Sequence, residues 1–186
     1  ATSWEEWKPQ LLSYFNGGVP PKCVAIGEIG LDFFYDNSPR KEQLLCFEEQ
    51  VELAKSLDLP IAIHCREAFD DLFEVLNRVG LPNRRGVMHC FTGTTEEAKK
   101  SVDLGFKISF SGILTFKKAE SLRETAKALP LDALMIETDC PFLTPEPHRG
   151  KPNEPSYLPL TAKVLSSVLA LDLEEVVGKT TANTRA

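Results

Sequence analysis

Short apolar runs that alternate with longer helical patterns are the feature that most restricts the fold of this chain. The apolar runs span residues 23–27, 60–64, 86–90, 106–110 and 133–138, and the helical patterns span residues 3–15, 40–57, 68–79, 95–104, 117–129, 157–171 and about 172–178. A strand followed by a helix, repeated about five times, predicts a parallel sheet with crossover helices. Both a doubly wound sheet and a (β/α) barrel satisfy this pattern. Neither Gly-x-Gly-x-x-Gly nor Gly-x-x-x-x-Gly-Lys is present, which disfavours the nucleotide-binding folds.

Two helical patterns also begin with the spacing of a capping box, in which a hydroxyl and a carboxylate satisfy the first backbone N–H groups. Ser3 and Glu6 have this spacing, and so do Thr94 and Glu97. Helices are therefore expected to begin at these two places.

The composition indicates an ordinary globular protein rather than a membrane or nucleic-acid-coating one. The chain is 42% hydrophobic and 26% charged, with a net charge of -6, and no apolar run approaches the roughly 20 residues of a membrane span. An acidic chain has no broad attraction for nucleic acid, although bound metal ions can supply positive charge locally. The cysteine count is odd, five, with no Cys-x-x-Cys pair, which favours reduced thiols in a cytoplasmic protein.

Metal-binding side chains follow four of the five predicted strands. The first run ends at Glu28, the second at His64, the third at His89, and the fifth continues into Glu137 and Asp139. The carboxyl ends of parallel strands lie on one edge, where the active sites of (β/α) barrels are built. Two carboxylates and two imidazoles suit zinc, manganese or another divalent ion. A single histidine at a strand end is more often a hydrogen-bonded structural residue, so that alternative stays open.

Alternation of side chains along a strand places the neighbouring cysteines away from the histidines. If His64 points inward, Ile63 and Cys65 point outward beneath the helices, and His89 similarly separates Met88 from Cys90. We therefore interpret both cysteines as small buried hydrophobes rather than metal ligands.

Five sequence motifs, taken together and in order, resemble those of the TatD family of metal-dependent deoxyribonucleases. They are GEIGLD at residues 27–32, PIAIHCRE at 60–67, HCFTG at 89–93, ETDCPFL at 137–143 and RGKPNEP at 149–155. The resemblance implies a metal-dependent hydrolase on a TIM barrel of the amidohydrolase type, with two divalent ions (magnesium, manganese or zinc) and DNA as substrate. It implies that Glu28 shares the ions, that His64 and His89 bind one of them, and that Asp139 binds the other. Glu28 and Asp139 are then also the expected catalytic carboxylates.

The resemblance also nominates substrate-binding residues. Arg149, Lys151 and Asn153 fall in a proline-rich loop expected near the mouth of the site, with capping of the barrel as the simpler alternative. Arg66 is expected to meet a phosphate, and an ion pair with Glu67 or Glu137 is an equal alternative.

The chain departs from the family pattern at one important place. Family members begin with a strand that carries His-x-His, but the only histidines here are His64, His89 and His148. We therefore expect an α/β, TIM-barrel type fold that is incomplete, with about five of the eight strands, forming one domain over residues 1–186 that lacks the N-terminal strands. Open sheet edges favour aggregation, so we expect self-association or a complementing N-terminal segment. Two other functions remain open: an ester or amide hydrolase, such as a D-aminoacyl-tRNA deacylase, and a catalytically incompetent fragment.

Overall fold

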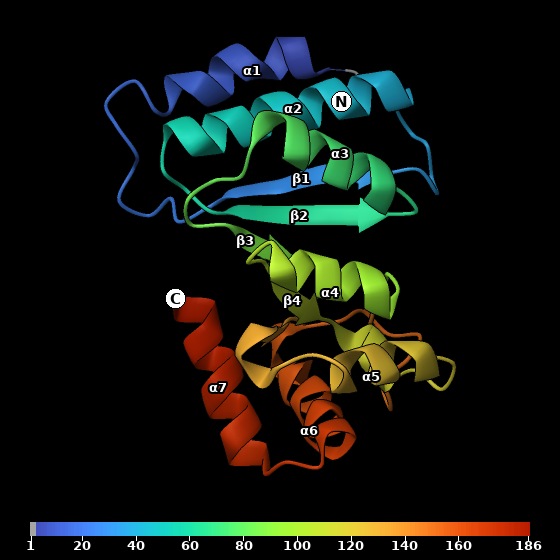
Figure 1. The fold of residues 1–186 in the computed structure, drawn as a ribbon. Helices are drawn as coiled ribbons and strands as arrows, with labels where there is room; N and C mark the ends of the chain where they lie inside the picture. The colour runs from blue at the N-terminus through green and yellow to red at the C-terminus, as the bar shows by residue number, and fades with distance from the viewer. Residues whose placement is uncertain (1–2) are drawn as a thin grey trace. The chain divides into compact units, whose positions relative to one another are not determined.

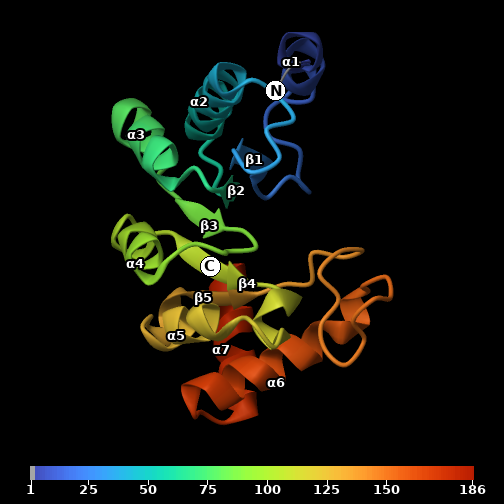
Figure 2. The ribbon, with the colours of Figure 1, turned by 90° about the vertical axis from the view of Figure 1, so that its right-hand side faces the viewer.

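The computed structural model describes residues 3–186, which form two compact units, one up to Val87 and one from Met88 onward. The ribbon is shown in Figure 1, and in Figure 2 after a quarter turn. The elements, in chain order, are α1 (Trp4–Ser13), β1 (Ile26–Asp32), α2 (Arg40–Ser56), β2 (Ile61–Arg66), α3 (Phe69–Val79), β3 (Gly86–Met88), α4 (Thr95–Asp103), β4 (Lys107–Phe110), η1 (Gly112–Thr115), α5 (Glu120–Lys127), η2 (Leu131–Ala133), β5 (Leu134–Ile136), η3 (Pro155–Tyr157), α6 (Leu158–Leu169) and α7 (Leu173–Arg185).

The first unit is a parallel strand pair covered by helices. β1 runs parallel to β2, and Figures 1 and 2 both place α2 and α3 on the same side of these strands. Along β2 the side chains alternate as predicted, because Ile61, Ile63 and Cys65 are buried whereas His64 and Arg66 are partly exposed. The apolar face lies under the helices, and the opposite face carries the polar groups. This alternation confirms the prediction that Cys65 is a small buried hydrophobe.

The first strand lies further along the chain than the sequence predicts. Residues 23–27 were expected to form it, with Glu28 at its end, but β1 begins at Ile26 and continues to Asp32. A register shift between Ile26 and Ile29 lets the strand continue beyond Gly27, where the apolar run is interrupted. Glu28 is therefore inside β1, and Asp32 occupies its carboxyl end.

The second unit also contains a parallel strand pair, with β4 beside β5. Its core is built around large side chains that are almost completely buried: Met88, Phe106, Ile108, Phe110, Leu114 and Leu134. The helices α6 and α7 pack against each other and against β5. β5 ends at Ile136, earlier than predicted, so Glu137 and Asp139 lie in the segment that follows the strand.

The predicted helices are confirmed, with two corrections at their ends. Thr94 and Glu97 form a complete capping box at α4, but Ser3 makes no side-chain cap at α1. The last helix, α7, was expected to end near Gly178, but it continues to Arg185. Within residues 3–186, no helix combines the length and apolar character that a bilayer crossing requires.

Candidate functional site

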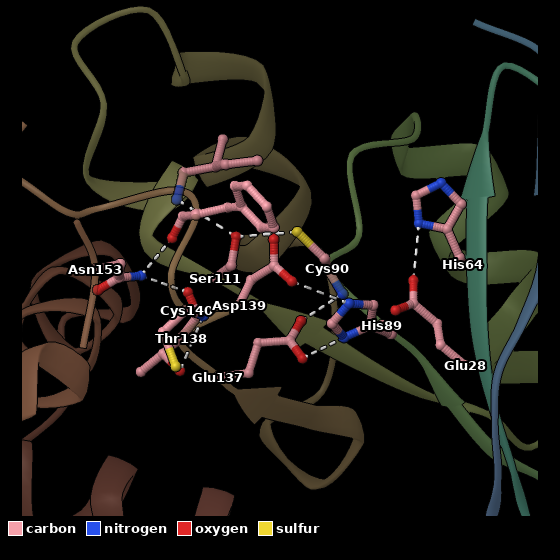
Figure 3. A network of polar contacts seen from close by, with 12 residues as sticks. Glu28, His64, His89, Cys90, Ser111, Glu137, Thr138, Asp139, Cys140 and Asn153 are labelled. Atoms are coloured by element: carbon pink, nitrogen blue, oxygen red, sulfur yellow. Dashed lines mark hydrogen bonds and ion pairs between the residues drawn. The ribbon is translucent and has the colours of Figure 1, made fainter. Parts of the chain in front are cut away.

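In the first unit, His64 lies between two carboxylates of β1. His64 pairs in register with Gly30 of the neighbouring strand. Its Nδ1 lies 3.1 Å from Oε1 of Glu28, a contact drawn in Figure 3, and its Nε2 lies 3.2 Å from Oδ2 of Asp32. The imidazole therefore meets one carboxylate at each nitrogen. This geometry needs β1 and β2 in this register, since the two acidic side chains come from one strand and the histidine from the other.

Gly30 permits the close approach that this register requires. Its φ is +141°, and a Cβ atom built there would lie 1.9 Å from the carbonyl oxygen of His64. Only glycine fits at such a position without displacing the backbone. The Gly-Leu-Asp part of the sequence motif therefore fixes the spacing between the strands beside the histidine.

The Glu28, Asp32 and His64 cluster is accessible from solvent. The three side chains line a pocket of about 370 Å³, to which α2 contributes Gln43 and Cys46. The His64 side chain is 36% exposed, so an ion or a substrate group can reach it.

The carboxylates around His64 make its surroundings strongly negative. The hydrogen bond with Glu28 raises the pKa of His64, burial opposes the rise, and the charges of Glu28 and Asp32 add to it. A field that favours a proton on the imidazole also attracts a metal cation, although the ligating nitrogen must then give up that proton.

In the second unit, His89 lies between Glu137 and Asp139. Its Nδ1 is 2.5 Å from Oε2 of Glu137, and its Nε2 is 3.4 Å from Oδ1 of Asp139, as Figure 3 shows. The other oxygen of Glu137 accepts a hydrogen bond from the backbone N–H of Cys90. Glu137 thus contacts both the His89 ring and the backbone of the segment that follows β3. The second imidazole nitrogen is left facing Asp139.

The backbone at this cluster is held in an uncommon conformation. Cys90 and Asp139 both have positive φ, +45° and +57°, which is a left-handed region that L-residues seldom adopt. Such residues concentrate at functional sites, where the surrounding contacts hold them in place. Here the contacts are the Glu137 carboxylate and Ser111, whose hydroxyl accepts a hydrogen bond from the Cys90 thiol at 3.2 Å.

The prediction for Cys90 therefore needs correction. It was expected to be a small buried hydrophobe pointing away along a strand, but β3 ends at Met88 and Cys90 is only partly buried, with its thiol hydrogen-bonded. The alternation rule failed because the strand had already ended.

Four of the predicted site residues thus form two pairs, one in each unit. Glu28 contacts His64, and His89 contacts Asp139. Because the pairs belong to separate compact units, their convergence on one site stays a prediction. Asp32 had no predicted role, and Glu137 was predicted only as a metal-competent side chain after the fifth strand and as an alternative ion-pair partner of Arg66. The signal for Glu137 was visible in the Glu-Thr-Asp motif, whereas Asp32 was hidden by the early end assigned to the first strand.

Each cluster offers the donor chemistry of a divalent-metal site but not a finished one. Within residues 3–186, no three His, Cys, Asp or Glu side chains gather as a metal-binding group. The geometry explains this, because in each cluster the two carboxylates meet different nitrogens of the same imidazole and do not converge on a point. Imidazole with carboxylate suits zinc or manganese, so His64 with Glu28 and His89 with Asp139 fit as partial ligand sets.

The predicted substrate loop is ordered around Asn153. This side chain is 6% exposed, and its amide nitrogen donates to the carbonyl oxygens of Thr138 at 2.7 Å and Phe142 at 2.6 Å, while its oxygen accepts from the N–H of Glu154. Asn153 therefore ties the loop to the segment that carries Asp139, and a substrate contact of this residue stays a prediction.

The two basic residues of this loop are exposed. Arg149 lies with its guanidinium 3.8 Å from the centre of the Phe116 ring and donates to the carbonyl oxygen of Thr144. Lys151 also lies at the surface. A substrate-binding role for Arg149 and Lys151 stays a prediction.

Arg66 has aromatic neighbours that the sequence reasoning did not consider. Its guanidinium carbon lies 3.9 Å from the centre of the Phe34 ring and 4.8 Å from that of Tyr35. Both rings belong to the segment that leaves β1, so Arg66 and these rings lie at the same strand ends as Asp32.

Comparison with known proteins identifies relatives over nearly the whole chain. A family model described as "TatD related DNase" matches residues 3–186. An uncharacterized metal-dependent hydrolase of Bacillus subtilis, YabD, is 46% identical over 164 residues, which cover 88% of this chain and 64% of that protein. An uncharacterized metal-dependent hydrolase of Escherichia coli, YcfH, is 41% identical over 160 residues, covering 86% of this chain and 60% of that protein.

The fold also matches a solved structure. The crystal structure of YjjV, a TatD homologue from Escherichia coli, superposes with a TM-score of 0.87 at 36% identity, covering 98% of this chain and 68% of that one. This match confirms the predicted α/β fold of the incomplete TIM-barrel type. The chain spans 60–64% of the length of the two sequence relatives.

Proposed function

Because the chain belongs to the TatD-related DNase family, we propose that it carries part of a metal-dependent active site that hydrolyses phosphodiester bonds in DNA. One observation carries the proposal: in each compact unit, a histidine that lies on a strand or directly after one is paired with carboxylates. In unit one the pair is Glu28 with His64, and in unit two it is Asp139 with His89. The relatives named above are metal-dependent hydrolases, which supports hydrolysis as the reaction class.

The side chains divide the work between holding an ion and orienting its ligands. Glu28 and Asp139 bring negative charge to one nitrogen of each imidazole, whereas Asp32 and Glu137 engage the other nitrogen. A carboxylate on the far nitrogen fixes the tautomer and the ring orientation. Each ring therefore already has a fixed orientation, and the nitrogen that binds a cation must exchange its contact with the carboxylate for the ion.

The proposed chemistry is attack of water on phosphorus. When bound, a divalent ion lowers the pKa of water toward neutrality and offsets the negative charge of the phosphodiester. Asp139, 27% exposed and next to His89, is placed to accept the proton that the attacking water loses. The proton then leaves with the departing oxygen, which completes hydrolysis of one P–O bond.

A nuclease assay with a matched pair of variants tests the proposal. We expect the chain to cleave single-stranded DNA with added manganese, magnesium or zinc, and EDTA to stop cleavage. Asp139→Asn is expected to lower the rate by at least about 100-fold, whereas Asp103→Asn, the same change at an exposed position of α4, leaves it unaltered. An active Asp139→Asn protein contradicts the role of Asp139. Metal-stimulated cleavage of a p-nitrophenyl ester without cleavage of DNA indicates the ester-hydrolase alternative, and no metal-stimulated hydrolysis of either indicates an incompetent chain.

A further inference from the structure

Two consecutive aromatic side chains stand exposed beside the His64 cluster. Phe34 is 49% exposed and Tyr35 is 60% exposed, and their rings meet edge to face with centroids 4.9 Å apart. Large aromatic surface in water is unfavourable, and where it is gathered with a cation it frequently marks a binding surface. By contrast Phe33, the first aromatic of the same run, is buried.

An arginine completes this surface. Arg66 lies over both rings, and its strand position pairs with Asp32 in the β1–β2 register. A guanidinium stacks on aromatic rings while its N–H groups remain able to bind phosphate oxygens. Phe34, Tyr35 and Arg66 together form what we call the aromatic platform.

One carboxylate connects the platform with the candidate metal ligand. Oδ1 of Asp32 accepts hydrogen bonds from the backbone N–H groups of Phe34, at 3.0 Å, and Tyr35, at 2.9 Å. Oδ2 of the same side chain lies 3.2 Å from Nε2 of His64. The platform is therefore held at a fixed place close to the histidine rather than on a loose loop.

We propose that the aromatic platform binds an unpaired nucleobase of single-stranded nucleic acid through stacking, next to the His64 cluster. The proposal rests on the proposed phosphodiesterase function, which requires a nucleic-acid strand near this histidine. Any base offers a flat face to an aromatic ring, so stacking binds strands without reading their sequence. Base-paired DNA keeps those faces covered, which is why the platform suits a single strand. In an acidic chain of net charge -6, Arg66 also supplies local attraction for the adjoining phosphate.

The test compares a strand that has bases with one that lacks them. Fluorescence anisotropy would measure binding of a labelled oligothymidylate and of an abasic oligonucleotide with the same number of phosphates, at low ionic strength and with EDTA to prevent cleavage. We expect the chain to bind the oligothymidylate at least about fivefold more tightly, since stacking contributes on the order of 1–3 kcal/mol per base. Tyr35→Leu is expected to abolish this preference.

A matched tyrosine provides the control. Tyr14, 63% exposed just beyond α1, is as accessible as Tyr35, and Tyr14→Leu is expected to keep the full preference. Arg66→Lys retains the positive charge but loses the planar guanidinium, and it is expected to reduce the preference. It gives a second test if circular dichroism shows that the Tyr35→Leu variant does not fold. Equal affinity for both oligonucleotides, absence of binding to either, or a preference that survives both variants would overturn the platform.

The outcome is separable from the nuclease proposal. A base preference that depends on Tyr35, in a protein that cleaves no DNA, supports the platform and rejects the nuclease function. Metal-dependent cleavage with no base preference supports the nuclease function and rejects the platform. Sedimentation gives a further check. If the chain self-associates, Tyr35→Leu dissociates the assembly and no base preference is found, the rings serve self-association instead.

Discussion

At the scale of single residues, Glu137 fixes the orientation of the His89 ring. One of its oxygens contacts Nδ1 of the imidazole, and the other holds the backbone N–H of Cys90. Both contacts involve a side chain that is only 21% exposed, so they are moderately shielded from water. The negative charge behind the ring is therefore expected to make the far nitrogen of His89 a stronger ligand.

The corresponding prediction concerns Glu137→Gln. Glutamine has nearly the same shape but only one acceptor oxygen, so the change removes the negative charge and one of the two hydrogen bonds. We expect zinc affinity, measured by isothermal titration calorimetry, to fall by about 10-fold or more, as is typical when the carboxylate behind a ligating histidine is altered. Glu124→Gln, at an exposed glutamate of α5 that pairs with Lys127, is the control and is expected to bind zinc like the wild type. Identical affinity in the Glu137 variant would contradict the positioning role.

A second metal-binding prediction concerns His64. Its contact with Glu28 is expected to provide part of one ion's site, and His64→Ala removes the imidazole. We expect the zinc affinity of this variant to fall by at least about 10-fold in the same titration. The control substitution is His148→Ala, at a partly exposed histidine that stacks against Tyr157. Equal binding by the His64 variant would show that zinc is held elsewhere.

The residue types at the candidate site were predictable, but their partners were not. Glu28, His64, His89 and Asp139 were identified because metal-competent side chains followed strand after strand. The contacts of Asp32 and Glu137 with the histidines were not predicted, because sequence order does not show which nitrogen of an imidazole a carboxylate will meet. The backbone contacts of Asn153 were not predicted for a related reason: a polar residue in a functional motif can bind the backbone of its own loop.

At the scale of elements, glycine decides where β1 can pair. The first strand was predicted to end at Gly27, where the apolar run ends. In the structure β1 continues through Gly27 and Gly30, and the second glycine lies against the backbone of His64. The apolar pattern locates strands well, but it cannot show that a glycine is present for close approach rather than for termination.

Gly30→Ala tests this interpretation through stability. The added Cβ would meet the carbonyl oxygen of His64 at a φ that L-residues rarely adopt, so we expect a loss of at least about 1 kcal/mol. The midpoint of urea unfolding should fall accordingly. Gly178→Ala, inside α7 where nothing lies within 4 Å, should instead stabilise by roughly 0.5–1 kcal/mol. An unchanged midpoint for Gly30→Ala would mean that the strands can separate there at no cost.

The helix starts provide a matched prediction of opposite outcomes. Thr94 accepts a hydrogen bond from the N–H of Glu97, whereas Ser3 has the same sequence spacing but no cap. Thr94→Ala is therefore expected to lower stability by about 1 kcal/mol, and Ser3→Ala to leave it nearly unchanged. Thermal unfolding followed by circular dichroism measures both. A larger effect at Ser3 than at Thr94 would reverse the assignment of the caps.

At the scale of the whole molecule, the second unit carries an open pocket with a largely apolar lining. Side chains of β5, α6 and α7 line a cavity of about 350 Å³, including Ile136, Leu158, Ala162 and Val177. Val177 is 42% exposed. Exposed apolar surface favours association, and self-association or a complementing segment stays a prediction.

Sedimentation velocity of the 186-residue chain provides the measurement. We expect a concentration-dependent increase in sedimentation coefficient, and Val177→Lys is expected to suppress it by placing a charge in the cavity. Val24→Lys, at a valine that is 73% exposed and belongs to the first unit, should leave association unaltered. A chain that remains monomeric at every concentration would contradict the prediction.

The alternation of apolar runs and helical patterns was sufficient to predict the class of architecture. It indicated parallel strands with helices, and the β1–β2 and β4–β5 pairs are parallel. It could not predict the division into two compact units near Val87, because the sequence there reads as one more strand among others. Local periodicity produces a regular sequence pattern, whereas the density of long-range contacts does not.

The two contacts of the Asp32 carboxylate have a consequence for substitutions around the His64 cluster. Its two oxygens serve different tasks, one for the backbone of Phe34 and Tyr35 and the other for His64. A change at this carboxylate alters both tasks at once, whereas the two aromatic side chains can be exchanged without touching the histidine. Replacement of Asp32 is therefore expected to disturb the aromatic platform and the His64 cluster together, whereas replacement of Phe34 or Tyr35 changes the platform alone.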